Sequence, residues 1–391
     1  MNNNSEFQKI TKYVLLSGGS LDWNELYKTS LSVIFDVMAR TRQNPAYHKE
    51  IDVLSHTKMV CEAMMEQPEY KNGSEADKTI LFWSALLHDL GKPACTVEVD
   101  GVLKSPHHAS KGAILARELL WKEFGLCGSL ESQQIREAIC NLINYHAFPP
   151  YAHSAKNAEM RLLKIASNGE LVKGFSLAKL CALERADALG RICADGDDLL
   201  ERVEYCRALC EEIGCLEKSY EFANDYSKRA YFKGKTAWRE QDMFNDSWGT
   251  VILMSGLPGT GKDTYIAKKY HDMPMVSLDD IRKELKISPT DNQGRVISVG
   301  HERARELLRK KQPFVWNATN ITAQTREMQI ALFEDYGASV ETVFLETEWS
   351  EQLNRNKNRA AEVPPSVIEN MFSKLTLPER FESEKVRWEI V

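Results

Sequence analysis

The sequence VILMSGLPGTGKDT, residues 251–264, joins an apolar run to a glycine-rich loop and then to a charged, helix-forming segment. The apolar run predicts a buried strand. Glycine allows the backbone to turn several N–H groups toward one bound phosphate. The lysine of such a loop reaches the outer phosphates, and the N-terminus of the next helix adds positive charge. The stretch therefore predicts a P-loop that binds ATP or another nucleoside triphosphate through Gly256, Gly259, Thr260, Gly261, Lys262, Asp263 and Thr264.

One position departs from the usual P-loop pattern, because Asp263 directly follows the lysine where a serine or threonine normally binds Mg²⁺. A carboxylate is also a hard oxygen ligand and is favoured at a helix N-terminus. It would repel the phosphates unless the metal ion lay between them. We therefore expect Asp263 to bind Mg²⁺, directly or through water, with the hydroxyl of Thr264 beside it.

The patterns on either side of this stretch divide the chain. From residue 249 onward, β-type runs (VILMS, PMVSL, PFVWNA and SVETVFLE) alternate with helical ones such as HERARELLRKKQ, which predicts a parallel sheet wrapped by helices. Residues 25–215 instead repeat apolar residues every three or four positions, as in LSVIFDVMAR, KTILFWSALLHDL and IREAICNLINYH. The sequence thus predicts a multidomain protein with an all-α domain over 1–215, a connector over 216–248 that packs against one or both domains, and an α/β P-loop domain over 249–391.

Composition and charge limit the classes of protein to which the chain can belong. A net charge of −6 argues against a protein that coats nucleic acid, although a few local cations can bind a strand end. No apolar stretch is long enough to span a bilayer, and the start MNNNSEFQKITKY lacks the layout of a secretory signal, so we expect a cytoplasmic protein without membrane partners. The nine cysteines form no CxxC pair and are interpreted as reduced core thiols, with a zinc knuckle as the alternative.

Four further motifs follow the P-loop. SLDDIR (277–282) follows the second predicted strand and separates Asp279 from Arg282 by one helical turn. WNATN (316–320) ends the third predicted strand. NRNKNR (354–359) places Arg355 and Arg359 four residues apart, which predicts a shared helix face. EVPPSVIENMFSKL (362–375) predicts a turn followed by a helix.

In this order the motifs resemble the kinase domain of phage-type 5′-hydroxyl polynucleotide kinases, over nearly the whole predicted domain. The resemblance implies that Asp279 is the general base on the attacking 5′-hydroxyl and that Arg282 binds the adjacent phosphate. It implies that Thr319 and Asn320 line the active site, and that Arg355 and Arg359 form a helical lid over the transferring phosphoryl group. The plain alternatives are a helix cap for Asp279, a turn cap for Asn320 and a solvated helix face for the two arginines.

Histidine is concentrated in the other half, where seven of the nine lie within the first 153 residues. LLHDLGKP places His88 beside Asp89 at the end of an apolar helix. Such neighbours reach one site only where a helix bends or ends, or they serve two metal ions. Helical segments also carry His56 (DVLSHT), His108 (HHASKGA), His146 (INYHAFPP) and Asp187 (RADALGR). Imidazole with carboxylate and without thiolate suits Mn, Fe, Co, Ni or Zn.

This H…HD…D pattern resembles the HD superfamily of metal-dependent phosphohydrolases. The resemblance implies that one metal ion is held by His56, His88, Asp89 and Asp187, and that a second is held by His108 and His146 with Asp89 bridging. It also implies that Lys92, one turn after His88 if that helix continues, steadies a phosphate oxygen. The alternatives are core histidines at positions 108 and 146 and a helix-end cation at position 92. His48, His107 and His153 have no place in the pattern and are interpreted as surface or outer residues.

The order of the two halves resembles the bacterial bifunctional HD-domain polynucleotide kinase proteins of nucleic-acid end healing. The resemblance implies removal of a 2′,3′-cyclic, 2′- or 3′-phosphate from RNA or DNA ends by the first half and ATP-dependent phosphorylation of 5′-hydroxyl ends by the second. Mg²⁺ would serve the kinase, one or two transition metal ions would serve the HD half, and a separate ligase would seal the ends. Two alternatives stay open: a nucleotide phosphohydrolase joined to a small-metabolite kinase, and a kinase with a non-catalytic HD binding module.

Overall fold

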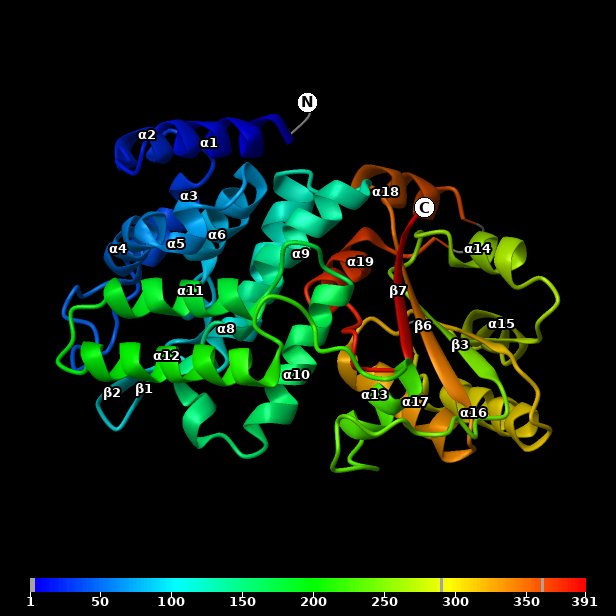
Figure 1. Cartoon of the computed structure of the whole chain (residues 1–391). Coiled ribbons are helices and arrows are strands. Elements are labelled where there is room, and N and C mark those ends of the chain that lie inside the picture. The colour runs from blue at the N-terminus through cyan, green and yellow to red at the C-terminus, as the bar shows by residue number, and fades with distance from the viewer. Residues whose placement is uncertain (1–3, 289–290, 360–361) are drawn as a thin grey trace. The chain divides into compact units, whose positions relative to one another are not determined.

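The computed structural model describes residues 4–288, 291–359 and 362–391. The chain divides into two compact units, Met1–Tyr220 and Glu221–Val391, which are described one at a time (Figure 1). Among the described residues, no helix combines the length and the apolar content that crossing a bilayer would require.

The first unit is mostly helical, as the apolar periodicity predicted. Its α-helices are α1 (Asn4–Leu16), α2 (Trp23–Tyr27), α3 (Ser32–Ala39), α4 (Val53–Glu66), α5 (Pro68–Lys71), α6 (Glu75–Leu87), α7 (Lys92–Cys95), α8 (His108–Glu118), α9 (Leu130–Tyr145), α10 (Ala158–Ser167), α11 (Leu177–Leu189) and α12 (Gly196–Ile213). A π-helical turn, Leu119–Glu123, extends α8, and 3₁₀ turns span Pro149–Ser154 and Asn168–Glu170.

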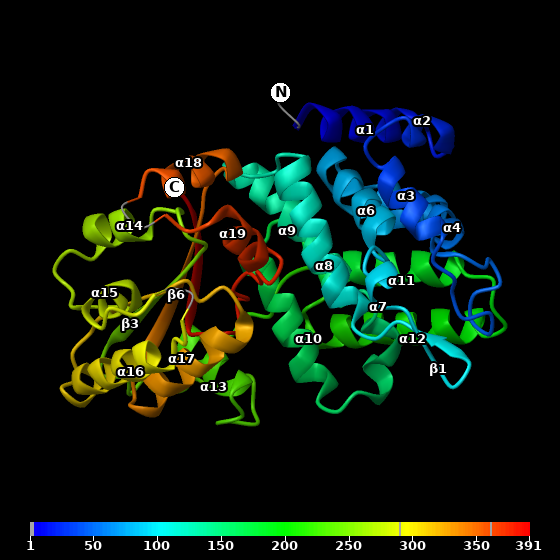
Figure 2. The same cartoon turned by 180° about the vertical axis from the view of Figure 1, so that it is seen from behind.

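Helix α6 forms the centre of this unit. A capping box between Ser74 and Asp77 starts the helix, and every residue from Thr79 to Leu87 is buried. A helix that is buried all round must be covered by other helices, and α4, α9 and α11 pack against it. Helices α11 and α12 lie side by side in Figure 1, and α8 lies beside α9 in Figure 2.

One element of the first unit departs from the expected all-α domain. Strands β1 (Val97–Val99) and β2 (Val102–Lys104) form an antiparallel hairpin. Asp100 and Gly101 make its turn with positive φ angles of 53° and 75°, as a two-residue type I′ turn requires. The Asp-Gly pair between alternating valines was a hairpin signal in the sequence, but only three residues extend it on each side.

The second unit contains a five-stranded parallel sheet, as predicted. Its strands are β3 (Thr250–Ser255), β4 (Met275–Ser277), β5 (Val315–Asn317), β6 (Ser339–Glu346) and β7 (Lys385–Ile390), in the spatial order β4-β5-β3-β6-β7. Its helices are α13 (Asp225–Phe232), α14 (Lys262–Lys269), α15 (Leu278–Glu284), α16 (Gly294–Arg309), α17 (Ala323–Asp335), α18 (Trp349–Lys357) and α19 (Pro365–Phe372). Four strands follow the expected runs, whereas β7 was not expected.

Successive side chains of a strand point to opposite faces of its sheet. Strand β3 contributes to a core on each face, so both faces of this sheet are covered. Val251 and Leu253 of β3 enter a core with Phe314 and Phe333, while Ile252 and Met254 enter a second core with Ile266 on α14. The central position of β3 places the loop that follows it at the carboxyl edge of the sheet, between β5 and β6. Ligands of open α/β sheets bind at that edge.

The expected connector, residues 216–248, contains a helix of its own. Asn224 caps α13, which buries Ala230, Tyr231 and Phe232 within the second unit. Arg229 of this helix makes two hydrogen bonds, of 2.7 and 3.0 Å, to the carboxylate of Glu334 on α17.

Candidate active sites

Helix ends position three of the four expected histidine ligands. His88 and His146 are the C-caps of α6 and α9, and His108 is the first residue of α8. In each ring Nδ1 bonds the carbonyl oxygen three residues earlier, in Ala85 (2.8 Å), Ile143 (2.7 Å) and Ser105 (2.9 Å). Two of these carbonyls belong to the last turns of helices, which leave backbone oxygens without a helical partner.

These bonds determine which nitrogen of each ring is free. A carbonyl oxygen only accepts, so Nδ1 carries the proton and Nε2 keeps its lone pair, the form in which imidazole binds metals. His56 on α4 follows the same rule, because its Nδ1 lies 3.1 Å from the carbonyl oxygen of Gly190. Four metal-binding nitrogens are thereby available in one unit.

The free nitrogens converge in two groups. In one, Nε2 of His56 lies 3.3 Å from Nε2 of His88 and 2.8 Å from Oδ1 of Asp187. In the other, Nε2 of His108 lies 3.3 Å from Nε2 of His146. Two ligand atoms that share one zinc-type ion at about 2.1 Å in tetrahedral geometry would be about 3.4 Å apart. The structure thus brings together the residues that the sequence predicted.

Asp89 lies between the two groups. Its Oδ2 is 3.2 Å from His88 and 3.6 Å from His56, while its Oδ1 is 3.6 Å from His108. Both oxygens are buried. Oδ2 is balanced by the ammonium group of Lys92 at 2.6 Å, whereas Oδ1 has no such partner among the described residues. A buried carboxylate oxygen beside unprotonated imidazole nitrogens suits a further cation, so the two groups, His56, His88 and Asp187 and then Asp89, His108 and His146, fit divalent metal ions.

The six residues His56, His88, Asp89, His108, His146 and Asp187 are called the metal cage. Burial acts to lower the pKa of His56, but its contacts with Asp187 and Glu50 outweigh burial and raise the pKa. The electrostatics keep three other ligands in their metal-binding forms. Burial, with the nearby charges of His88 and His108, lowers the pKa of His146 to about 3. Burial acts to raise the pKa of Asp89, but the charges of His88 and Lys92 outweigh it and hold the pKa well below its usual range. The charge of Arg191 does the same for the pKa of Asp187 against its burial. Both carboxylates are ionised and His146 is neutral.

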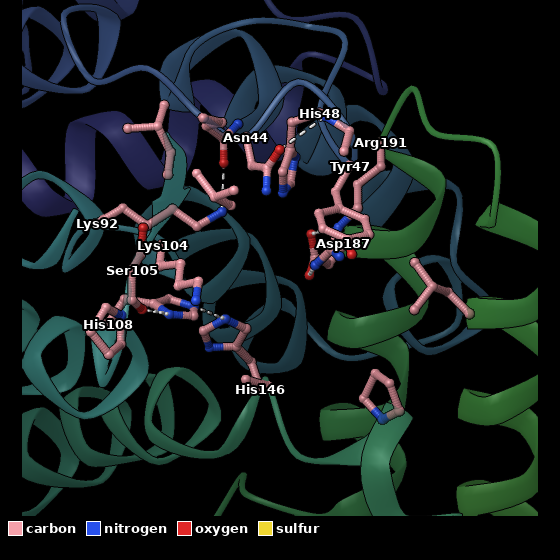
Figure 3. A pocket seen from close by; sticks show the side chains of 18 of the residues that line it. Asn44, Tyr47, His48, Lys92, Lys104, Ser105, His108, His146, Asp187 and Arg191 are labelled. Carbon is pink, nitrogen blue, oxygen red and sulfur yellow. Dashed lines mark hydrogen bonds and ion pairs between the residues drawn. The ribbon is translucent and has the colours of Figure 1, made fainter. Parts of the chain in front are cut away.

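Lys92 lies beside the metal cage, but it does not belong to the same helix as the residues before His88, although the sequence had suggested that it would. Helix α6 ends at Leu87, and Lys92 begins the separate helix α7 after a turn. Its Nζ lies 2.6 Å from Oδ2 of Asp89 and donates a hydrogen bond to Gln43. The cage opens into a cavity of about 730 Å³, which Lys92, His108, His146 and Asp187 help to line (Figure 3).

Several residues of this site were not expected from the sequence. Glu50 contacts both Nδ1 of His56 (3.2 Å) and Nδ1 of His48 (2.6 Å). Of the two interpretations given for His48, surface or outer residue, the buried outer position is the one that the structure shows. Glu184, one turn before Asp187, is buried, and burial together with the charge of Asp187 raises its pKa well above the usual range. These positions carry no motif, and only the fold brings them to the site.

The cysteines take no part in the metal cage. None of the nine forms a disulfide, and none belongs to the clusters of metal-ligating side chains found in the described parts of the chain. Six of them are buried, as expected for core thiols.

The P-loop of the second unit has the predicted strand-loop-helix context. Gly256 and Gly259 have φ angles of 146° and 83°, which side chains rarely adopt. A Cβ on Gly259 would lie 2.6 Å from the carbonyl oxygen of Gln352, and one on Gly256 would lie 2.8 Å from that of Leu345. Only glycine fits these two positions. The hydroxyl of Thr260 donates to the Leu257 carbonyl inside the loop.

Lys262 folds back over the loop that precedes it. Its Nζ donates to the carbonyl oxygens of Gly256 (2.8 Å) and Leu257 (2.9 Å). Burial lowers the pKa of this lysine to about 8, against the opposing charge of Asp263. Phosphate oxygens would be stronger partners for the ammonium group than these carbonyls.

Asp263 is held in place by a side chain that the sequence did not point to. Its Oδ1 accepts a hydrogen bond of 2.7 Å from Nδ2 of Asn317, the last residue of β5. Asn317 lies in the WNATN motif, two and three residues before the expected Thr319 and Asn320.

The expected residues Asn320 and Thr319 contact the backbone beside the P-loop. The side chain of Asn320 donates to the backbone carbonyl of Met254, and the backbone carbonyl of Thr319 accepts the N–H of Gly256. Thr264 is exposed on the first turn of α14.

The acceptor-side residues lie together beside the P-loop. Ser277 caps α15, so Asp279 is free of the capping role. Its carboxylate pairs with Arg282 and lies 3.4 Å from the guanidinium of Arg359. Burial acts to raise the pKa of Asp279, but Arg282 and then Arg359 outweigh it and lower the pKa. The carboxylate is therefore ionised and able to accept a proton.

The two lid arginines do not share a helix face, which corrects the expectation from their spacing. Helix α18 ends at Lys357, so Arg355 is helical and Arg359 lies beyond the helix. A Cβ on Gly261 of the P-loop would lie 3.4 Å from the guanidinium of Arg355, while Arg359 reaches Asp279. The arginines therefore approach the site at two different points.

Comparisons with known proteins agree with this division. Residues 53–172 match the family model of the HD domain, and residues 251–378 match a family model described as an AAA domain. The HD match ends before Asp187, which the fold brings to the cage. A curated protein named L-seryl-tRNA(Sec) kinase, from Methanococcus maripaludis, is 23% identical over 147 residues, or 36% of this chain. The similarity spans 56% of the length of that protein.

The two matches cover separate parts of the chain: the HD match contains five of the six cage residues, all but Asp187, and the other match contains the P-loop with Asp279, Arg282, Arg355 and Arg359. The chain therefore joins an HD domain of the hydrolase type to a P-loop domain of the kinase type.

Proposed function

We propose that the chain is a bifunctional nucleic-acid end-healing enzyme. Its HD domain removes a 2′,3′-cyclic, 2′- or 3′-phosphate, and its kinase domain transfers the γ-phosphate of ATP to a 5′-hydroxyl. The observation that carries the proposal is the grouping of Asp279, Arg282 and Arg359 beside the P-loop, on the same chain as a metal cage that suits phosphoester hydrolysis.

In the kinase reaction the 5′-oxygen forms a bond to the γ-phosphorus while the bond to the β-phosphate oxygen of ADP breaks. Asp279 accepts the proton of the attacking hydroxyl. Arg282 and Arg359 bracket this carboxylate, so the acceptor hydroxyl and its adjacent phosphate enter a positively charged position. Lys262 exchanges its carbonyl partners for the phosphates of ATP. Asp263, whose carboxylate accepts a hydrogen bond from Asn317, would hold Mg²⁺.

In the hydrolytic reaction the oxygen of a water molecule forms a bond to phosphorus, and the bond to the ribose 2′- or 3′-oxygen breaks with protonation of that oxygen. Metal ions bound by His56, His88, Asp89, His108, His146 and Asp187 would supply positive charge and an ionised water. Lys92 lines the cavity next to Asp89 and is placed to bind a phosphate oxygen.

One assay tests both reactions. A short RNA with a 5′-hydroxyl and a 2′,3′-cyclic phosphate is incubated with ATP and Mg²⁺, with and without Mn²⁺, Ni²⁺ or Co²⁺, and both ends are examined. We expect a 5′-phosphate and an opened or removed terminal phosphate. Lys262→Ala should abolish only the first change and Asp89→Asn only the second, while Asp100→Asn in the exposed hairpin turn should alter neither.

The alternatives give other products. A small-metabolite kinase leaves the 5′-hydroxyl unchanged, and a non-catalytic HD module leaves the cyclic phosphate intact. Loss of both reactions from a single substitution would show that the two sites do not act independently. The similarity to a protein named as a seryl-tRNA kinase supports a hydroxyl as phosphoryl acceptor, and seryl-tRNA is therefore a useful competing substrate in the same assay.

A further inference from the structure

The cavity over the metal cage is larger than a terminal phosphate requires. Its volume of about 730 Å³ lies in the range of sites that hold whole organic ligands. Residues 42–48, the end of the β1–β2 hairpin and the 3₁₀ turn after α9 form its outer part. Apart from Gln43, which contacts Lys92, and His48, which contacts Glu50, the residues of this outer part have no role in the reaction described above.

The cations of the cavity divide into two kinds. Lys92 and Arg191 are each paired with a carboxylate of the cage, Asp89 and Asp187 respectively. Arg42 and Lys104 also line the cavity, and within the described parts of the chain the side chains of both make no ion pair or hydrogen bond. Two cations of the outer part are thus available to an anion that comes from outside.

Two aromatic side chains flank the same opening. Tyr47 is 53% exposed and Tyr151 is 60% exposed, although both line the cavity. Neither ring stacks on another side chain among the described residues. Figure 3 shows Tyr47 close to Arg191 and Asp187, with Lys92 and Lys104 projecting from the opposite side. An exposed aromatic face beside unpaired cations suits a nucleobase attached to a phosphodiester.

We propose that Arg42, Lys104, Tyr47 and Tyr151 form an outer subsite that binds the last nucleotides of a single-stranded RNA. The two cations bind the phosphodiester on the 5′ side of the terminal nucleotide, and the two rings stack on bases. This inference rests on the proposed function and specifies its substrate: the HD domain acts on a strand end in preference to a free nucleotide. The net charge of −6 is compatible with it, because only one phosphodiester needs neutralising.

The test compares two substrates that end in the same group. One is a mononucleoside 2′,3′-cyclic phosphate without a 5′-phosphate, and the other is a hexanucleotide with the same 3′ terminus. We expect the wild-type protein to have the higher kcat/KM for the hexanucleotide. Arg42→Ala/Lys104→Ala and Tyr47→Ala/Tyr151→Ala should each lower kcat/KM about tenfold more for the hexanucleotide than for the mononucleotide. The mononucleotide offers one base and no phosphodiester, so the hexanucleotide loses one further stacking contact or the phosphodiester contact. The cation variant should also show a weaker dependence of the hexanucleotide reaction on salt.

Matched controls separate the subsite from general effects. Lys12→Ala removes an exposed lysine of α1. Tyr205→Ala removes a tyrosine of α12 that is 51% exposed. Neither residue lines the cavity. Both controls should keep the wild-type preference, and all variants should keep the wild-type metal content, which reports an intact cage. Equal loss on both substrates, or a wild-type preference in both double variants, would overturn the outer subsite and leave the proposed function standing. Hydrolysis of neither substrate by the wild-type protein would overturn the proposed function and the subsite with it.

Discussion

At the scale of single residues, neighbours determine the chemistry more than residue type does. The four histidines of the cage keep the lone pair of Nε2 available because each Nδ1–H donates a hydrogen bond to a backbone carbonyl oxygen. Asp89 and Glu184 are both buried carboxyls, yet nearby cations lower the pKa of Asp89, whereas burial beside Asp187 raises that of Glu184. Asp263 likewise depends on Asn317 for its orientation. Some of these partners are local, such as the carbonyl groups three residues before His88, His108 and His146, whereas Gly190 for His56 and Asn317 for Asp263 are distant in sequence.

A prediction at this scale concerns Asp263. If its carboxylate binds Mg²⁺, Asp263→Ala should raise the Mg²⁺ concentration needed for half-maximal kinase activity by about tenfold or more. At other metal sites, losing a residue that only hydrogen-bonds a metal ligand already lowers affinity by about tenfold. Asn317→Ala should shift it in the same direction but less, because the carboxylate stays and only its hydrogen bond is lost. The measurement is a Mg²⁺ titration at saturating ATP. Wild-type Mg²⁺ dependence in Asp263→Ala would show that the aspartate is not a metal ligand.

At the scale of elements, close approaches between segments hold the sites together. Gly91 follows the His-Asp pair in the turn between α6 and α7. A Cβ at this position would lie 2.0 Å from the carbonyl oxygen of His108 and 2.6 Å from the backbone nitrogen of Gly112. The turn that carries Asp89 therefore lies directly against the helix that carries His108.

The close approach predicts the effect of Gly91→Ala. The methyl group must push α8 away from the turn, so we expect a stability loss of about 1–3 kcal/mol, as for other overpacked sites, and a lower metal content. Thermal unfolding and elemental analysis of the purified protein measure the two effects. Gly196→Ala is the control, because its Cβ would meet only Cys193 Sγ at an ordinary 3.7 Å. Equal stability of the two variants would contradict the argument.

The end of α18 yields a second prediction at this scale. Arg359 lies beyond the helix and contacts Asp279, so Arg359→Ala should lower the kinase kcat by about 1000-fold if it stabilises the transferring phosphoryl group. The KM for ATP should change much less. Lys357→Ala, an exposed substitution at the last position of α18, should leave kcat unchanged. A similar kcat for both variants would show that Arg359 is a surface residue without a role in phosphoryl transfer.

At the scale of the whole molecule, the chain behaves as two units with separate cores. The boundary between Tyr220 and Glu221 assigns α13 to the unit that carries the P-loop. Arg229 and Asp225 of this helix pair with Glu334 and Arg380, and its aromatic residues are buried. The segment expected to connect the domains therefore contributes to the packing of one of them.

Two fragments test this assignment. Residues 221–391 should fold and keep kinase activity, whereas residues 249–391 lack α13 and should lose a few kcal/mol of stability through the exposed apolar surface that remains. Circular dichroism melts and 5′-phosphorylation assays compare them. Equal melting temperatures would show that α13 is not part of the folded unit.

The sequence by itself determined the local features of this protein. Glycine spacing after an apolar run indicated the P-loop, and short β-type runs alternating with helical ones indicated the sheet and its helices. Both signals come from residues that are close in the chain, whereas the metal cage was indicated by the order of His and Asp residues and a family resemblance. The hairpin was missed because its strands have three residues each, and β7 was missed because KVRWEI alternates charged and apolar residues without a continuous apolar run.

Only the tertiary structure decided which side chains meet. It placed Asp89 between two pairs of histidines, gave Asp263 the partner Asn317, which the sequence had not indicated, and separated Arg359 from the helix of Arg355. It also gathered Arg42, Lys104 and two tyrosines around one cavity, although none belongs to a motif. Contacts between distant segments depend on how helices and strands pack, and a single sequence carries no local pattern for that packing.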